Sequence, residues 1–212
     1  MSAPGEPRFQ QVRDDYAALE PGRSDTWNPL LRDVELEHRI ELMRRLVEAL
    51  RVSGQDYAQL KVLDVGCGNG RSTRMYLELG IQPSQLTGID LRPDALDLAK
   101  SLNPAVRWLP VSDAPWPIES SSVSWVSLCT VFSSIKPAAD RQHLANEISR
   151  VLKPAGQLFF WDRKVALDFA GGDALLPTDW FSDMQLLWHA DADVRGYKAA
   201  SPTHGAWLLQ RP

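Results

Sequence analysis

The sequence predicts an α/β fold in which helices cover both faces of a doubly wound sheet. Between residues 61 and 161, short apolar runs alternate with amphipathic stretches, the pattern of parallel strands joined by helical crossovers. A glycine-rich turn, "VGCGNG", follows the first apolar run, where such sheets bind their ligands. The 212 residues, 44% of them hydrophobic, suffice for one domain and are few for two.

The elements can be assigned in chain order. Strands are expected over residues 61–65, 85–90, 106–111, 123–131 and 157–161, with two more at 184–189 and 204–210. Helices are expected over residues 72–79 and 93–102, with a further helix ending at residue 152. The run at 123–131 is nearly all apolar, so both of its faces should be covered.

The chain should begin with a flexible N-terminal arm over residues 1–25, which is rich in Pro, Gly and charge and holds one short helix near residues 12–19. Residues 26–212 should form a single domain, and the N-terminal arm together with the amphipathic helix at 29–50 should form part of a lid. On that helix Leu36, Ile40, Met43 and Val47 should face the core and His38 the solvent.

Composition restricts the partners. A net charge of −4 and a pI near 5.6 disfavour nucleic acid, and no apolar run approaches the ~20 residues of a membrane span. Cys67 and Cys129 lack the paired spacing of disulfides or zinc sites, and no acidic trio suggests another metal. We therefore expect a cytoplasmic protein without a metal that binds a small molecule, whereas the oligomeric state is not indicated.

The glycine turn does not have the dinucleotide-binding pattern. Its glycines are spaced G-x-G-x-G, and Arg71 stands where the G-x-G-x-x-G fingerprint needs a third glycine. Asp64, two residues before Gly66, would repel a pyrophosphate and suits an ammonium or sulfonium. A nicotinamide-dependent oxidoreductase is therefore a weaker interpretation. The alternative role for Asp64 is a carboxylate that stabilises the turn or the next helix.

Two further acids follow successive strands. Asp90 comes 24 residues after Gly66, where a carboxylate can accept hydrogen bonds from ribose hydroxyls. Asp113 follows the next strand and could accept the exocyclic amine of adenine. A cation, a ribose and an adenine bound along three strand ends describe S-adenosylmethionine.

The motifs "VLDVGCGNG", "GIDLRPDAL", "SDAP" and "VLKPAGQLFFWD" resemble those of the class I S-adenosylmethionine-dependent methyltransferases, of the type 11 or type 25 kind. The resemblance covers roughly residues 27–162 and returns at "HGAWLLQRP". "TVFSSI", "FFWDRK" and "WNP" further resemble a bacterial subgroup that tailors small molecules or glycans. The resemblance implies a Rossmann-like methyltransferase fold, with strand order 3-2-1-4-5-7-6 and an antiparallel last strand.

The resemblance also implies a set of cofactor-binding residues. These are Asp64, Gly66, Cys67 and Gly68 for the methionyl part, Asp90 for the ribose, Leu91, Asp113 and Ala114 for adenine, and Thr130 between cofactor and acceptor. Ala155 departs from the family pattern, which has a glycine in the turn before the fifth strand. Cys67 is expected to be a small buried residue and not a nucleophile.

The function implied is methyl transfer from S-adenosylmethionine to a small-molecule or sugar acceptor, first of all to a hydroxyl oxygen. "TVFSSI" replaces the Asp/Asn-Pro-Pro-aromatic motif after the fourth strand, which disfavours base or amide nitrogens as acceptors. Alignment of acceptor and methyl group supplies most of the catalysis. The alternative is a catalytically inactive protein that binds the cofactor as a partner or sensor subunit.

Candidate acceptor-side residues lie at the ends of the later strands. An unactivated hydroxyl needs a base, for which we expect His204 oriented by Asp162; a strand-end histidine bonded to a loop is the alternative. Trp27 and Phe132 would form pocket or core walls. Arg163 would hold an anionic substrate group or pair with Asp162.

Overall fold

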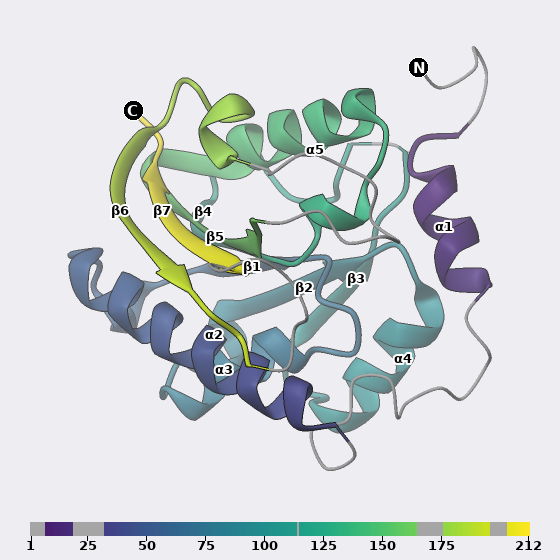
Figure 1. The fold of residues 1–212 in the computed structure, drawn as a ribbon, viewed down its shortest axis with the longest axis horizontal. Coiled ribbons are helices and arrows are strands. Elements are labelled where there is room, and N and C mark those ends of the chain that lie inside the picture. The colour runs from purple at the N-terminus through teal and green to yellow at the C-terminus, as the bar shows by residue number, and fades with distance from the viewer. Residues whose placement is uncertain (1–6, 19–31, 114, 165–175, 196–202) are drawn as a thin grey trace.

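A computed structural model of the chain describes residues 7–18, 32–113, 115–164, 176–195 and 203–212 (Figure 1). Its seven-stranded sheet has the order β3-β2-β1-β4-β5-β7-β6. The strands are β1 (Val62–Val65), β2 (Leu86–Asp90), β3 (Arg107–Pro110), β4 (Val123–Cys129), β5 (Leu152–Arg163), β6 (Gln185–Ala192) and β7 (His204–Gln210). β1 to β5 pair in parallel, and β7 is antiparallel to both β5 and β6. The predicted fold class and strand order are confirmed.

Helices lie on both sides of the sheet. They are α1 (Gln10–Ala17), α2 (Asp33–Val52), α3 (Arg71–Glu78), α4 (Pro93–Leu102) and α5 (Ala138–Val151). Figure 1 shows α2, α3 and α4 on one side and α5 on the other. Among the described helices, none has the length and apolar character needed to cross a bilayer.

The core has two parts, one on each face of the sheet. Val126, Leu128 and Phe160 pack toward α5, whereas Trp125 and Phe159 pack toward α2 and α3. Residues 123–128 of β4 are all buried, which confirms that this strand is covered on both faces. Apolar residues alternate to both sides because β4 is central and parallel to its neighbours.

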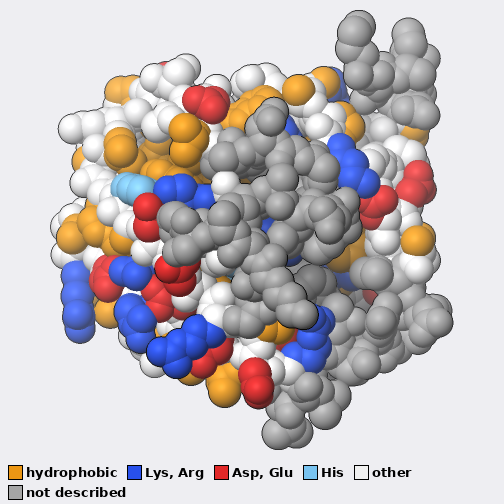
Figure 2. All heavy atoms as spheres, viewed as in Figure 1, with side chains coloured by type: hydrophobic (Ala, Val, Ile, Leu, Met, Phe, Trp, Pro, Cys, Tyr) orange, Lys and Arg blue, Asp and Glu red, His pale blue; other side chains and the backbone are white. Residues whose placement is uncertain are grey.

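The face that α2 turns inward differs from the prediction. Leu36 and Ile40 are 44% and 45% exposed, whereas Glu35, Glu41, Leu42, Leu46, Ala49 and Leu50 are buried. His38 also faces inward, and its Nε2 accepts a hydrogen bond of 3.0 Å from the indole of Trp161. The prediction took the apolar stripe for the buried face, but the first half of α2 covers polar strand ends. Figure 2 shows mixed acidic and basic side chains on the outer surface around α2 at the lower left.

β5 begins earlier than predicted, at Leu152 and not at residue 157. The Pro-Ala-Gly turn forms part of this strand because Ala155 donates a hydrogen bond to the carbonyl of Arg211, beyond β7. Ala155 has a φ of +59°, a left-handed conformation that costs an alanine about 1 kcal/mol.

The segment before α2 contains a helix that packs against the core. In α1 Val12 is buried, as is Phe9 just before the helix, and both pack against the core on the α5 side of the sheet. The predicted boundary at residue 25 falls outside the described residues. The division of the chain into an arm and one domain therefore stays a prediction.

Candidate functional site

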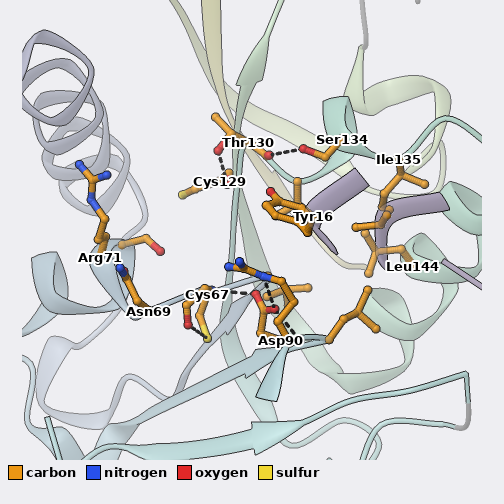
Figure 3. Close-up of a pocket in the computed structure, with 18 of the residues that line it drawn as sticks. Tyr16, Cys67, Asn69, Arg71, Asp90, Cys129, Thr130, Ser134, Ile135 and Leu144 are labelled. Atoms are coloured by element: carbon orange, nitrogen blue, oxygen red, sulfur yellow. Dashed lines mark hydrogen bonds and ion pairs between the residues drawn. The ribbon is translucent and has the colours of Figure 1, made fainter. Parts of the chain in front are cut away.

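A cavity of about 260 Å³ lies where the glycine turn, the end of β2, the end of β4, α1 and α2 meet. In Figure 3 Arg71 and Asn69 lie at one side of this cavity, Ile135 and Leu144 lie at the other, and Asp90 lies between them. Its size is close to the lower end of the range for small-molecule sites, about 300 Å³. The carboxyl ends of the parallel strands thus form a pocket, as expected for a doubly wound sheet.

The glycine turn supplies one wall of the cavity. Gly66 and Gly68 have φ angles of +66° and +52°, which residues with a side chain rarely adopt. A Cβ at Gly66 would lie 2.5 Å from a methyl carbon of Val131. Burial raises the pKa of the Cys67 thiol far above its usual range, so Cys67 stays protonated and serves as packing.

Asp90 is an acid that faces the cavity. One carboxylate oxygen accepts a 2.8 Å hydrogen bond from the amide of Gly68, and the other accepts a 2.9 Å bond from the amide of Arg92. These bonds fix the carboxylate and leave it acceptor capacity for a ligand. Apolar side chains next to it continue the lining: Leu91, Val111, Ile135 and Leu144.

Asp64 is not among the described residues that line this cavity. It is 1% exposed and accepts hydrogen bonds from the hydroxyls of Ser72, at 2.7 Å, and Thr73, at 2.5 Å. Burial raises its pKa to about 6. One oxygen of Asp64 thus holds two side chains at the start of α3, and its role in cofactor binding stays a prediction.

Asp113 interacts with the N-terminal helix. Its carboxylate accepts hydrogen bonds of 3.0 Å from the guanidinium of Arg13 and from the amide of Arg8. Tyr16 also lines the cavity, and its ring centroid lies 4.4 Å from the guanidinium carbon of Arg92. α1 therefore forms a roof over this end of the cavity. Ala114 and Trp27 lie outside the described residues.

The end of β4 borders the opposite part of the cavity. Thr130 lines it with a φ of +56°, which is unusual for a β-branched residue. Its amide donates a 2.7 Å bond to the carbonyl of Trp161, and its hydroxyl donates a 2.7 Å bond to the carbonyl of Cys129. Arg163, which is 8% exposed, also lines the cavity. Phe132 is fully buried in the core against Phe160, Trp180 and Phe181.

His204 and Asp162 lie on opposite faces of the sheet. His204 pairs across the strands with Arg163, and Asp162 pairs with Gly205. The ring of His204 stacks on Trp161 at a centroid distance of 5.1 Å, whereas Asp162 accepts a 3.1 Å bond from the amide of Ser133. Among the described residues that line the cavity, Arg163 and His38 are present but His204 and Asp162 are not.

The titration of His204 gives a testable consequence. Burial lowers its pKa to about 2, so below pH 6.5 the unfolded chain binds a proton that the folded chain cannot hold. Stability should therefore fall as the pH drops from 6.5 toward 2. Between pH 7 and pH 5, the wild type should therefore lose about 2 kcal/mol more of its free energy of unfolding than His204→Asn does. Urea unfolding of both proteins across this range measures the difference, and parallel curves would contradict it.

Comparison with known proteins shows which proteins the chain resembles. Residues 63–160 match the family model of a methyltransferase domain. This stretch, a little under half of the chain, is similar to the class I S-adenosylmethionine-dependent methyltransferases. The match supports S-adenosylmethionine as the cofactor to be tested against the cavity.

Several methyltransferases illustrate the similarity. A malonyl-[acyl-carrier protein] O-methyltransferase of Serratia marcescens is 33% identical over 121 residues, covering 56% of this chain and 44% of that protein. A tRNA U34 carboxymethyltransferase of Saccharophagus degradans is 29% identical over 207 residues, covering 94% of this chain and 58% of that protein. The chain thus spans about half the length of these relatives. The N-methyltransferase NodS of Bradyrhizobium japonicum WM9, solved with S-adenosylhomocysteine, has a TM-score of 0.66 at 18% identity, covering 96% of this chain and 98% of NodS.

The cavity fits S-adenosylmethionine. A fixed carboxylate, Asp90, lies beside an apolar wall that suits a ribose and its base. The left-handed glycine turn brings backbone close to the same space. Within the described ranges, no three His, Cys, Asp or Glu side chains gather in a way that could hold a metal ion.

Proposed function

We propose that this methyltransferase transfers the methyl group of S-adenosylmethionine to a hydroxyl oxygen of a small molecule or sugar. The observation that carries the proposal is a single cavity in which the glycine turn and Asp90 share a lining with Thr130 and Arg163. A cofactor held by the glycine turn and Asp90 would extend as far as Thr130 and Arg163. The name O-methyltransferase of the Serratia relative supports oxygen as the accepting atom.

Asp90 would accept the ribose hydroxyls, and Leu91 with the neighbouring apolar wall would pack on the adenine. When bound, the cofactor supplies a methyl group on a sulfonium, which requires an aligned nucleophile. The chain's own part is to hold that alignment and to exclude water. α1, the residue before it and α2 help to exclude water, because Phe9, Val12 and Leu42 bring apolar surface to the cavity.

A base formed by His204 and Asp162 is not part of this proposal. The register places the two side chains on opposite faces of the sheet, and His204, with a pKa of about 2, binds a proton weakly. Burial also raises the pKa of Asp162. An acceptor hydroxyl that ionises readily, such as a phenol, would need no base from the protein.

A small acceptor is favoured over RNA. One relative is named for tRNA, but the net charge of this chain is −4, and several arginines around the cavity pair with acids, as Arg13 does with Asp113 and Arg39 with Glu78. Binding of a phosphate backbone relies on basic side chains available to neutralise phosphates.

The test is transfer of labelled methyl from S-adenosylmethionine to three sets of acceptors: small phenols and sugars, small carboxylic acids, and bulk tRNA. We expect label on the first set. Label on tRNA would overturn the acceptor class. Binding of S-adenosylhomocysteine without transfer to any acceptor would favour the alternative of an inactive cofactor-binding subunit.

A further inference from the structure

The amino-acid end of the cofactor carries an ammonium and a carboxylate, and its ammonium requires an acceptor in the cavity. Asp64 was the sequence-based candidate, but its carboxylate is directed to Ser72 and Thr73 in α3. Asp90 is directed to the amides of Gly68 and Arg92 beside the ribose position. Asp64 is also not among the residues that line the cavity, so an acid that does line it is better placed to face the ammonium.

Glu35 is such an acid. It lies in the first turn of α2, is 6% exposed and lines the cavity. Its nearest recorded cation is Arg71, with 3.8 Å between Glu35 Oε2 and Arg71 Nη1, which exceeds hydrogen-bond length. Burial raises the pKa of Glu35. A buried carboxylate is costly without close partners, and a ligand cation would reduce that cost.

Arg71 is the matching cation. It is the first residue of α3, directly after the glycine turn, and it also lines the cavity. In Figure 3 it lies beside Asn69, on the side opposite Ile135 and Leu144. A guanidinium presents paired N–H donors that match a carboxylate. Glu35 and Arg71 therefore present a negative and a positive group together at the glycine-turn end of the cavity.

We propose that Glu35 and Arg71 bind the amino-acid end of the methyl donor. The Glu35 carboxylate accepts hydrogen bonds from the α-ammonium, and the Arg71 guanidinium donates to the α-carboxylate. The inference rests on the proposed function, because it takes the cofactor to lie in this cavity. It adds an acid from α2 that stands outside the glycine-turn motif and 29 residues before Asp64.

Two ligands separate this role from a general effect on the pocket. S-Adenosylhomocysteine contains the amino-acid end, whereas 5′-methylthioadenosine keeps the adenine, ribose and sulfur but lacks it. Calorimetric titration of Glu35→Gln and Arg71→Met should show at least about tenfold weaker binding of S-adenosylhomocysteine for each variant. Binding of 5′-methylthioadenosine should stay within about threefold of wild type. Glu37→Gln, the same charge change in α2 outside the cavity lining, is the matched control.

Two other outcomes would overturn the inference, and a third would refute the proposed function. Equal losses for both ligands would show that the variants disturb the whole pocket, and unchanged binding of S-adenosylhomocysteine would show that the pair does not touch the ligand; either result overturns the inference. Wild-type protein that binds neither ligand would refute the proposed function itself. Circular dichroism of each variant confirms that it is folded.

Discussion

Replacing Asp90 with alanine is expected to weaken the binding of S-adenosylhomocysteine by about 100-fold and to reduce methyl transfer accordingly. Hydrogen bonds to a charged acceptor each contribute about 1.5–3 kcal/mol, and the Asp90 carboxylate can accept from both ribose hydroxyls. The substitution also frees the amides of Gly68 and Arg92, which should loosen the turn beneath the ligand. Both effects weaken the binding of the ligand.

The measurement is calorimetric titration with S-adenosylhomocysteine. Asp94→Ala is the matched control, because Asp94 is an exposed acid in the first turn of α4, four residues along the chain. It should bind like the wild type. A folded Asp90→Ala protein whose dissociation constant stays within threefold of wild type would remove Asp90 from the site.

Trp125→Ala is expected to lower the free energy of unfolding by about 4 kcal/mol. Trp125 is fully buried in β4. Its ring stacks on Phe159 at a centroid distance of 6.2 Å, and its indole N–H donates a 2.8 Å bond to the hydroxyl of Tyr76. Alanine would leave a cavity between the sheet and α3 and would remove the donor to Tyr76.

Urea unfolding followed by circular dichroism measures this change through the transition midpoint. Trp188→Ala provides the comparison, since Trp188 is only half-buried, in the edge strand β6. We expect it to cost about 1 kcal/mol. Similar losses for the two variants would mean that Trp125 does not have the central packing role described here.

Local patterns in the sequence were sufficient to locate much of the site. The apolar run before "GCGNG" and the position of Asp90 at a strand end depend on residues adjacent in the chain, and both lie where they were expected. Thr130 was likewise placed at the cavity from its position after an apolar strand. Such features follow from the periods of strands and helices and from the left-handed turn.

The remaining site residues depend on contacts between distant segments. Asp113 was expected to face adenine, but Arg13, 100 residues earlier, binds its carboxylate. His38 was expected to face the solvent and Glu35 was not singled out, because helical periodicity marks apolar residues as buried and takes no account of a polar cavity. Only the packing of α2 over the strand ends shows which stripe faces inward.

The roof formed by α1 also bears on how the protein is made. α1 has eight residues, and isolated helices shorter than about 12 residues are marginal in water. The contacts that hold it reach forward by 105 residues from Arg8 to Asp113 and by 131 residues from Phe9 to Asp140. Because a ribosome delivers the chain from its N-terminus, α1 must wait until most of the sheet has emerged. α1 is therefore synthesised before the sheet but docks after most of it, and the nascent protein passes through a stage in which the cavity has no roof.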